Sequence, residues 1–599
     1  MTTDHAPTDV PRRGPAPVRR VVATLATAAA CLALLAGPAA ALDAAAAGRS
    51  RRETSASSAA ARTGGGVVAA ENPLAADVGA DVLREGGSAV DAAVATAFAA
   101  CVLEPSSCGI GGGGFLVLWD PAARRARALD FRETAPARTR ADLYRDGDRA
   151  VVERSRRGGL AVGVPGEVAG LWEAHRRYGR LPWRRLVAPA ARLARGGFPA
   201  SEHLARQLTA NAAALAAEPT LSAILLGAAG RPPARGTIVR NPDLATTLDA
   251  IGAAGPRAFY RGRVAAAIAR AVRDSGGVLD VRDLASYRPR WREPLRVEYR
   301  GATVLTMPPP SGGGPALVTA LRTLERHDVA ALGVDSPTRW QLYAEILKHA
   351  FADRAQLAGD PDFGAPARRD AAAVPATRIT AAATHPPGFY GTAAPPPPDS
   401  GTSHVSVLSA DGGAAALTTT INTGFGALVG VPGTGIVLNN QIDDFSFDAP
   451  NLFGLVPGRA NRIAPGKRPA SSMTPTVAVR DGRPVVAVGA SGGPLIVSAT
   501  LEVLTNVLDF GLSPEAAVAA PRVHHQWQPD VLLVEPGVRP IDREALARIG
   551  HSLREAPMVA AVSIATSGAG GFAGAGDPRK GGGAHLAEAP SRAASPAAP

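Results

Sequence analysis

Lysine, cysteine and recognisable nucleic-acid-binding motifs are scarce or missing in this chain of 599 residues. Its three cysteines have no second Cys/His cluster at metal-ligand spacing, so the sequence offers no zinc-site motif. Lysine occurs only as Lys348, Lys467 and Lys580, and arginine therefore carries nearly all of the net charge of +12. Because the arginines are scattered singly or in pairs, compositional bias explains this charge better than nucleic-acid binding.

Long apolar runs are also missing, apart from one near the N-terminus. Val21 to Ala36 is apolar except for two threonines, follows four arginines between positions 12 and 20, and precedes the small residues Pro38 to Ala41. This pattern is typical of an export signal, which we assign to residues 1–45. The run is short for a membrane span, although an uncleaved anchor is an alternative. We therefore expect a soluble protein that is secreted or held in the cell envelope.

Two cysteines remain after the signal, Cys101 and Cys108. An oxidising compartment permits a disulfide between them, whereas closing so short a loop strains the bond. The sequence leaves both possibilities open.

Hydrophobic residues make up 46% of the chain, which is enough to bury a large core. The pattern of residues changes along the chain. Residues 46–65 are polar, small and expected to be disordered. Residues 168–286 have a largely helical pattern, and 297–307 is strand-like. After residue 402 the pattern becomes mostly short strands with returning helices, and residues 581–599 form a low-complexity tail. This order predicts an α+β protein with sheets between helical layers.

The boundary between the two halves carries the first candidate for chemistry, the segment Asp399 to Val407. It follows a proline run, Pro395 to Pro398, and enters a strand-like segment. If the Gly401–Thr402 bond were cut, Thr402 would present a hydroxyl nucleophile together with its own α-amine as the base. We expect the proline run to keep this cut point exposed and extended. A plain loop entering a strand is the simpler reading of the segment alone.

Polar residues at the predicted strand ends supply what such a nucleophile needs. Asn422, Gln441 and Asp444 can hold an ammonium, and Arg132 with Ser471-Ser472 can hold a carboxylate. Gly492-Gly493 lies between a strand and a helix, where backbone N–H groups can stabilise an oxyanion. Taken singly, each of these is more often a cap or turn residue.

The ordered motifs together resemble the gamma-glutamyltransferase (gamma-glutamyltranspeptidase) family from about Val67 to Arg579. The stretches that carry the resemblance include Gly86 to Ala93, Gly111 to Phe115, Asp130 to Glu133, Gly163 to Gly166, Met307 to Gly313, Ala352 to Arg354, Gly359 to Phe363, Thr402 to His404, Leu438 to Ser446, Lys467 to Met473 and Asp577 to Arg579.

This resemblance implies a four-layer αββα N-terminal-nucleophile hydrolase, made as one precursor and self-cleaved at Gly401–Thr402. It implies a large subunit of residues 66–401 and a small catalytic subunit of residues 402–580, associated as a heterodimer, with no metal or organic cofactor. The implied substrates are glutathione and other γ-glutamyl compounds, and the acceptors are water, amino acids or dipeptides.

The resemblance also implies a role for each candidate residue. Thr402 would be the nucleophile, supported by Thr420, and Gly492 with Gly493 would form the oxyanion hole. The implied substrate-binding residues are Arg132, Ser471 and Ser472 for the α-carboxylate, and Asn422, Gln441 and Asp444 for the α-amine.

The chain departs from the family pattern at three places. Ser403 replaces a second Thr, Pro494 replaces a hydrogen-bonding Ser, and Phe453 replaces a Tyr in the lid expected at about residues 448–458. The rival readings are a cephalosporin or glutaryl acylase, a polyglutamate-processing enzyme, and a non-catalytic exported homologue.

Three histidines invite a catalytic or metal-binding reading that we do not favour. His524-His525 has no third ligand in the sequence and is expected to be structural. His404 is expected to lie on the opposite strand face from Ser403 and to support the site rather than act as its base.

Overall fold

The structure is a computed structural model that describes residues 65–227, 230–366, 371–391, 401–447 and 458–587. The expected export signal, the segment up to residue 64, the proline run and nearly all of the expected lid, with Phe453, lie outside these residues. Within the described ranges, no helix is both long and apolar enough to cross a membrane.

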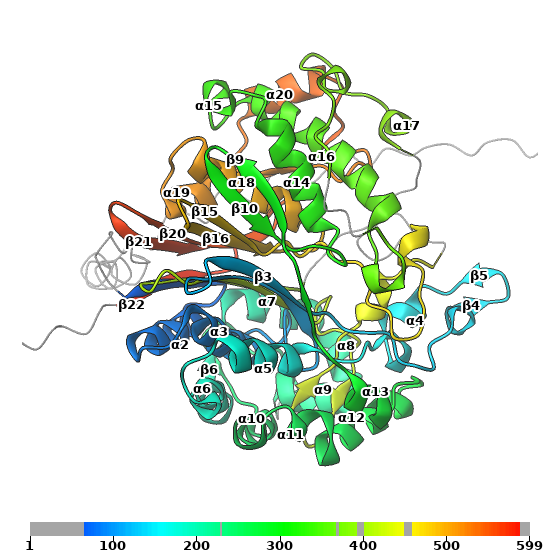
Figure 1. Ribbon diagram of the computed structural model, residues 1–599. Coiled ribbons are helices and arrows are strands. Elements are labelled where there is room, and N and C mark those ends of the chain that lie inside the picture. The colour runs from blue at the N-terminus through cyan, green and yellow to red at the C-terminus, as the bar shows by residue number, and fades with distance from the viewer. Residues whose placement is uncertain (1–64, 228–229, 367–370, 392–400, 448–457, 588–599) are drawn as a thin grey trace, which may run out of the picture. The chain divides into compact units, whose positions relative to one another are not determined.

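A seven-stranded antiparallel sheet forms the first of two central layers (Figure 1). In spatial order its strands are β22 (Gly583–Ala587), β1 (Gly66–Ala70), β11 (Ser403–Ser409), β12 (Ala414–Thr420), β2 (Gly113–Asp120), β3 (Arg125–Phe131) and β8 (Arg290–Arg292). The strand that begins just after Thr402 therefore lies in the interior of the sheet, between β1 and β12.

A six-stranded sheet forms the second layer. In spatial order its strands are β21 (Gly571–Gly576), β20 (Ala561–Gly568), β16 (Arg483–Ser491), β15 (Thr476–Arg480), β10 (Ala302–Thr306) and β9 (Leu295–Tyr299). The prediction of one strand over 297–307 is wrong, because Arg300 and Gly301 turn the chain at φ 49° and 71° and make a β9–β10 hairpin.

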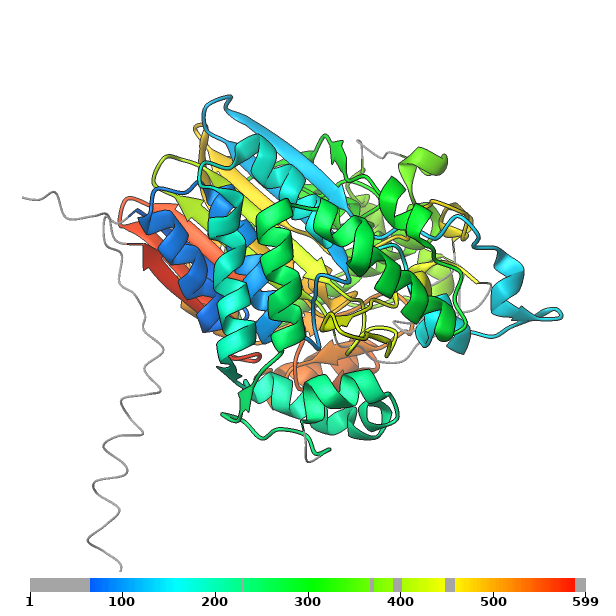
Figure 2. The same ribbon diagram turned by 90° about the horizontal axis from the view of Figure 1, so that it is seen from below.

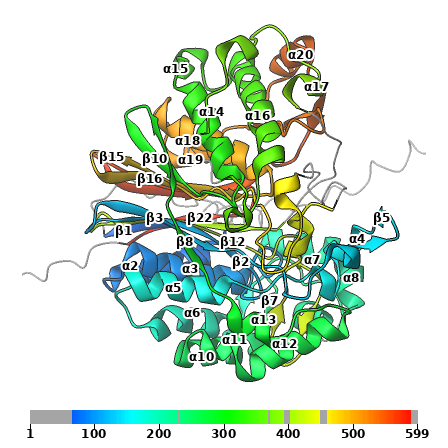
Figure 3. The same ribbon diagram turned by 45° about the vertical axis from the view of Figure 1, so that its right-hand side comes forward.

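Helices cover the outer face of each sheet, as Figures 1 and 3 show. The helices beside the seven-stranded sheet also appear in front of it in Figure 2. This helical layer comprises α2 (Pro73–Arg84), α3 (Ala89–Leu103), α5 (Glu167–Tyr178), α6 (Trp183–Gly196), α10 (Pro242–Ala254) and α12 (Gly262–Asp274). The opposite layer comprises α14 (Gly313–Leu324), α16 (Pro337–Leu357), α18 (Leu495–Leu508) and α19 (Pro514–Ala519). The expected αββα arrangement is confirmed.

The described chain also contains shorter α-helices and strands, besides short 3-10 and π-helical turns: α4 (Glu153–Arg156), α7 (Glu202–Ala210), α8 (Ala212–Ala216), α9 (Pro219–Leu221), α11 (Arg257–Tyr260), α13 (Val281–Ser286), α15 (Val329–Leu332), α17 (Pro387–Tyr390), α20 (Pro540–Arg548), β4 (Arg145–Asp146), β5 (Arg149–Ala150), β6 (Phe198–Pro199), β7 (Ile238–Val239), β13 (Gly430–Val431), β14 (Ile436–Val437), β17 (Val523–His524), β18 (Leu532–Val534) and β19 (Leu553–Glu555).

The core follows the alternation of side chains along the strands. On β1, Val68 packs with the first helical layer, whereas Val67 packs with the core that includes the six-stranded sheet. On β2, Leu116 and Phe115 divide in the same way. Every side chain of β11 is buried between these two cores, so the strand that follows Thr402 is fixed on both faces.

The C-terminal segment is more structured than its composition indicates. Residues 583–587, which we assigned to a low-complexity tail, form β22 and pair with β1. Small side chains suit this position because Gly576 and Gly582 lie against the backbone of Ala70, where a Cβ atom would come within 3.0 Å of its carbonyl oxygen. The glycine-rich composition here serves close strand packing.

Candidate active site

A hollow of about 320 Å³ lies at the start of β11 and gathers residues from distant parts of the chain. Nine of the candidate residues named above line it: Arg132, Thr402, Thr420, Asn422, Gln441, Asp444, Ser471, Ser472 and Gly493. Gly401 and Gly492 are the chain neighbours of two of these. Arg354, Met473, Pro494 and Ile496 complete the lining. The fold therefore brings the predicted set together.

The Gly401–Thr402 bond lies among hydroxyl groups. In the uncleaved chain, Oγ1 of Thr402 donates to the carbonyl oxygen of Gly401 at 2.5 Å, and Oγ1 of Thr420 donates to the same oxygen at 2.9 Å. The two hydroxyl oxygens are 3.3 Å apart. The backbone N–H of Asn422 donates to Oγ1 of Thr420 at 2.8 Å and so fixes its orientation. Two threonine hydroxyl groups thus donate to one carbonyl oxygen.

The expected exposure of this bond is wrong. Gly401 is buried and Thr402 is only 5% exposed. Gly401 has φ +138°, and a Cβ atom there would lie 2.6 Å from the carbonyl oxygen of Asn422. A glycine is therefore required for close backbone approach, and the bond is held inside the fold rather than presented on a linker.

Opposite charges stand at one end of the hollow. Arg132, which follows β3 and is 1% exposed, donates to Asp444 through a short charge-assisted hydrogen bond. The same guanidinium donates to the carbonyl oxygens of Ala470 at 3.0 Å and Pro469 at 3.4 Å. Gln441 donates to Asp444 at 2.9 Å. An anion-binding group and a cation-binding group are thus paired with one another in this structure.

Burial raises the pKa of both acidic side chains near Arg132. The pKa of Asp444 is raised by burial, and the charge of Arg132 opposes that rise. Burial raises the pKa of Glu133 to about 8, against the opposing effect of Arg132. Glu133 is therefore mainly protonated at neutral pH, and Asp444 is the carboxylate that balances Arg132.

Backbone turns position the remaining candidates. The N–H of Ser471 donates to the carbonyl oxygen of Pro310, and the N–H of Gly312 donates to that of Ser471 at 2.7 Å, which ties the serine pair to the Pro308–Gly313 turn. The hydroxyl of Ser472 is buried without a hydrogen-bond partner among the described residues. It is therefore available to a ligand.

Gly492 and Gly493 have φ +135° and +54°, which L side chains rarely adopt. Pro494 immediately precedes α18 and lines the hollow together with Gly493. Ser403 is buried on β11.

His404 lies between the sheets, on the face of β11 that meets β16. Its imidazole ring packs against Gly489. A Cβ atom at position 489 would lie 2.3 Å from a carbon atom of the ring. It contacts the hydroxyls of Thr418 at 2.8 Å and Ser406 at 3.1 Å. Burial lowers its pKa to about 3, so the imidazole is neutral. These contacts hold the ring between the two sheets, and His404 is not among the residues that line the hollow.

Two basic residues that the sequence reasoning did not assign to the site also belong here. Nζ of Lys580 donates to the carbonyl oxygen of Thr402 at 2.8 Å, to Oγ of Ser491 at 2.9 Å and to Glu71 at 2.9 Å. Lys580 thereby links Thr402, which precedes β11, to Ser491, which precedes Gly492. Its rarity, as one of three lysines, was a usable signal. Arg354 lies within a quoted motif but had no assigned role.

Other motifs have structural partners. His524 contacts Ser498 at 2.6 Å and Gln526 at 3.0 Å, and His525 lies 3.3 Å from Asp530. Burial lowers the pKa values of the two histidines to about 3 and about 4. Cys101 and Cys108 are buried free thiols, and burial raises the pKa of each.

The chain is similar to known proteins in both its sequence and its fold. A family model described as gamma-glutamyltranspeptidase matches residues 75–587. The chain is 40% identical to glutathione hydrolase 2 of Arabidopsis thaliana over 77% of this chain and 81% of that protein. It is 39% identical to the glutathione hydrolase proenzyme of Escherichia coli over 86% and 90% of the two chains.

Among solved structures, a cephalosporin acylase from Bacillus halodurans matches with a TM-score of 0.76 and 29% identity, covering 87% of this chain and 96% of that one. The family model spans most of the chain, and the relatives match over most of their own length. This chain belongs to the gamma-glutamyltranspeptidase family.

Proposed function

We propose that this protein is a self-processing γ-glutamyltransferase with glutathione hydrolase activity, and that Thr402 is its nucleophile. The observation that carries the proposal is the arrangement around Thr402. Its hydroxyl lies against the Gly401 carbonyl, in a hollow that also holds the Arg132–Asp444 pair. The two similar glutathione hydrolases support the same substrate class.

Self-processing begins with attack of the Thr402 oxygen on the Gly401 carbonyl carbon. Thr420 donates to the oxygen on which negative charge develops. The C–N bond breaks, its nitrogen gains a proton and becomes the α-amine of Thr402, and an ester joins Gly401 to the Thr402 oxygen. Water hydrolyses this ester, which leaves a carboxylate on Gly401 and a free hydroxyl on Thr402.

In turnover, the Thr402 hydroxyl attacks the γ-carbonyl of the substrate, and its α-amine takes the hydroxyl proton. The N–H groups of Gly492 and Gly493 stabilise the oxyanion. The proton passes to the leaving amine, and a γ-glutamyl ester remains on Thr402. Water or the amine of an amino acid or dipeptide then attacks the ester and restores the hydroxyl.

A γ-glutamyl group is zwitterionic at its α-carbon, so its recognition requires fixed charges of both signs. Arg132 with Ser471 and Ser472 takes the carboxylate, and Asp444 with Asn422 and Gln441 takes the ammonium. Binding exchanges the direct Arg132–Asp444 contact for two contacts with the substrate, which preserves charge balance in a buried place.

The proposal extends to maturation and location. Residues 66–401 and 402–580 remain together as a heterodimer, and residues 1–45 direct export. The product is a secreted or cell-envelope enzyme.

An acylase is the second candidate, favoured by the match to the cephalosporin acylase structure. Such an enzyme acts on an acyl group that need not carry an α-amine. The ammonium-binding set around Asp444 would then have no ligand, which makes this candidate the weaker one.

One experiment separates these functions. The purified protein is examined for two fragments meeting at Thr402, then assayed with γ-glutamyl and glutaryl p-nitroanilides, with and without glycylglycine. We expect two fragments, γ-glutamyl turnover and acceleration by glycylglycine. Thr402→Ala should abolish processing and turnover, and the matched Thr402→Ser, which keeps a hydroxyl, should retain both at reduced rates. An uncut, inert wild type would refute the enzyme proposal, and cleavage of the glutaryl substrate alone would establish an acylase.

A further inference from the structure

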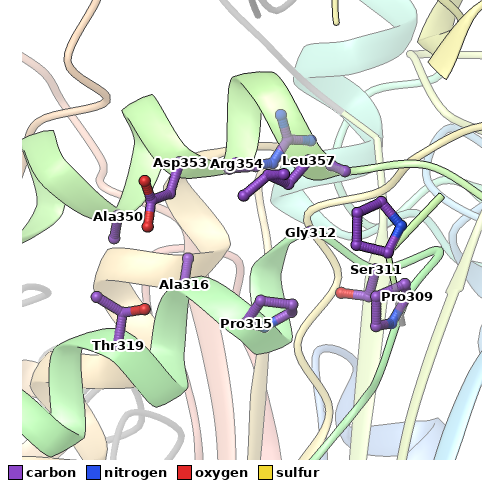
Figure 4. Close-up of a pocket in the computed structure, with 12 residues that line it drawn as sticks. Pro309, Ser311, Gly312, Pro315, Ala316, Thr319, Ala350, Asp353, Arg354 and Leu357 are labelled. Carbon is purple, nitrogen blue, oxygen red and sulfur yellow. The ribbon is translucent and has the colours of Figure 1, made fainter. Parts of the chain in front are cut away.

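Arg354 lies near the C-terminal end of α16, where its side chain separates two hollows. One is the candidate active site. The other, of about 340 Å³, lies between α14 and α16 and is lined by Gly312, Pro315 and Ala316 among others (Figure 4). In Figure 4 the guanidinium of Arg354 points away from Pro315 and Ala316. Gly312 makes room for it, since a Cβ there would lie 2.9 Å from Cγ of Arg354.

The Nε of Arg354 is buried without a hydrogen-bond partner among the described residues. Arg354 is 9% exposed, and its Nε is fully enclosed with no hydrogen-bond acceptor within the described ranges. Burial lowers its pKa to about 10, so it still carries its charge at neutral pH. Removing an unpaired cation from water is costly, and such a group is found where a ligand completes its contacts.

Arg132 differs in this respect. Its Nη2 donates to Asp444 and to the carbonyl oxygen of Ala470, and its Nε donates to the carbonyl oxygen of Pro469. Its Nη1 lies 3.9 Å from Glu133. A carboxylate that bound through Nη2 and Nε of Arg132 would have to displace these contacts. Beside it, the hydroxyl of Ser472 and Oε1 of Gln441 are both buried without partners in the described chain. Among the described residues, the hollow thus offers the Nε of Arg354 and the hydroxyl of Ser472 to an anion, and Oε1 of Gln441 to a cation.

The charges around the hollow lead to the same conclusion. Arg132 and Arg354 are positive, Asp444 is negative, and Glu133 is mainly protonated at neutral pH because its pKa is about 8. One positive charge is left over. Asp444 and Arg132 interact electrostatically with Arg354, so the extra charge stands at the same end of the site as the ion pair.

We propose that Arg354 provides a second guanidinium for the α-carboxylate of the γ-glutamyl group, alongside Arg132 and Ser472. Arg354 is then a substrate-specificity residue rather than a packing residue of α16. The inference rests on the proposed function and deepens it. It explains how a carboxylate is bound while Arg132 keeps part of its hydrogen bonding to the protein, and why the Nε of Arg354 has no hydrogen-bond partner among the described residues.

Three p-nitroanilides test this assignment. The γ-glutamyl compound carries both α-groups, the glutaryl compound lacks the amine, and the 4-aminobutyryl compound lacks the carboxylate. For Arg354→Gln we expect kcat/KM to fall about 10- to 100-fold on the first two, as for the loss of hydrogen bonds to a charged group. On the 4-aminobutyryl compound it should change less than about threefold. Arg354→Lys should be intermediate on the first two.

The decisive readout is the ratio of kcat/KM for the γ-glutamyl and 4-aminobutyryl compounds within one preparation. Misfolded protein cancels from this ratio, so a poorly folding variant still gives an answer. The matched control is Thr319→Val, which changes the wall of the neighbouring hollow only and should leave the ratio unchanged. An unchanged ratio in Arg354→Gln would overturn the inference. Failure of the wild type on the γ-glutamyl compound would instead overturn the proposed function.

Discussion

Replacing Lys580 with methionine should destabilise the protein and remove a hydrogen bond that holds the backbone of Thr402. Lys580 is 6% exposed. Its amine donates three hydrogen bonds, to Glu71, Thr402 and Ser491. Methionine fills similar space without a charge. Glu71, which is 2% exposed, would then be a buried carboxylate without its ion pair. Breaking one side of a buried pair costs about 3–5 kcal/mol, and we expect a loss of that size in the free energy of unfolding.

The pH dependence of this loss has a definite sign. Burial raises the pKa of Glu71, and Lys580 opposes the rise. Without Lys580 the pKa rises further above its unfolded value. The folded variant then binds a proton that the unfolded chain does not, so its stability increases as the pH falls. The difference between wild type and Lys580→Met should therefore narrow from pH 8 to pH 5.

Denaturant unfolding of uncut Thr402→Ala protein measures the loss in the free energy of unfolding, and its dependence on pH, without interference from processing. The set comprises Lys580→Met, Glu71→Gln and the double variant, all in that background. We expect the double variant to lose at least about 1 kcal/mol less than the sum of the two single losses, because the two side chains form one network. Additive losses that do not vary with pH would refute the assignment of Lys580 and Glu71 as a coupled buried pair.

Three further predictions concern groups near the site. Thr420→Val removes a donor to the Gly401 carbonyl and should slow self-processing about 100-fold, measured as fragment formation over time; an unchanged rate would remove Thr420 from the step. Above about pH 8, Glu133 should ionise and place a negative charge beside Arg132, which should raise KM for the glutaryl anilide. The variant Glu133→Gln should abolish this rise in KM. A rise in KM that persists in the variant would exclude Glu133 as its cause. Because Cys101 and Cys108 are free thiols, dithiothreitol should leave the thermal unfolding midpoint unchanged, and a lowered midpoint would indicate a disulfide.

Residue type and order indicated candidates for much of the site, and the resemblance to the gamma-glutamyltransferase family implied their roles. Thr402 after Gly401, the amides and carboxylate from Asn422 to Asp444, and the glycine pair each carry a local chemical signal. The fold then places them around one hollow. The order of residues along the chain could not show which groups already have hydrogen-bond partners. Arg132 donates to Asp444, whereas the Nε of Arg354 has no partner among the described residues.

The errors have a common physical origin. Lys580 meets Glu71 across 509 residues, and no local pattern encodes such a contact. Residues 583–587 are poor strand formers by composition, but pairing with β1 decides their structure. The proline run indicated an exposed cut point, whereas the close approach of Gly401 to Asn422 buries it. In each case a tertiary contact overrides the local tendency.

The order of strands in the two sheets determines whether the parts before and after Thr402 could separate or fold alone. In the seven-stranded sheet β1 comes from before Thr402, yet it lies between β22 and β11, which come from after it. The six-stranded sheet also joins the two parts, at the β10–β15 pair. If the chain is cleaved at Thr402 as proposed, neither fragment can separate from the other without breaking pairs of neighbouring strands in both sheets. Each piece made alone would present unpaired strand edges and tend to aggregate, so the intact precursor is the unit in which this enzyme must fold.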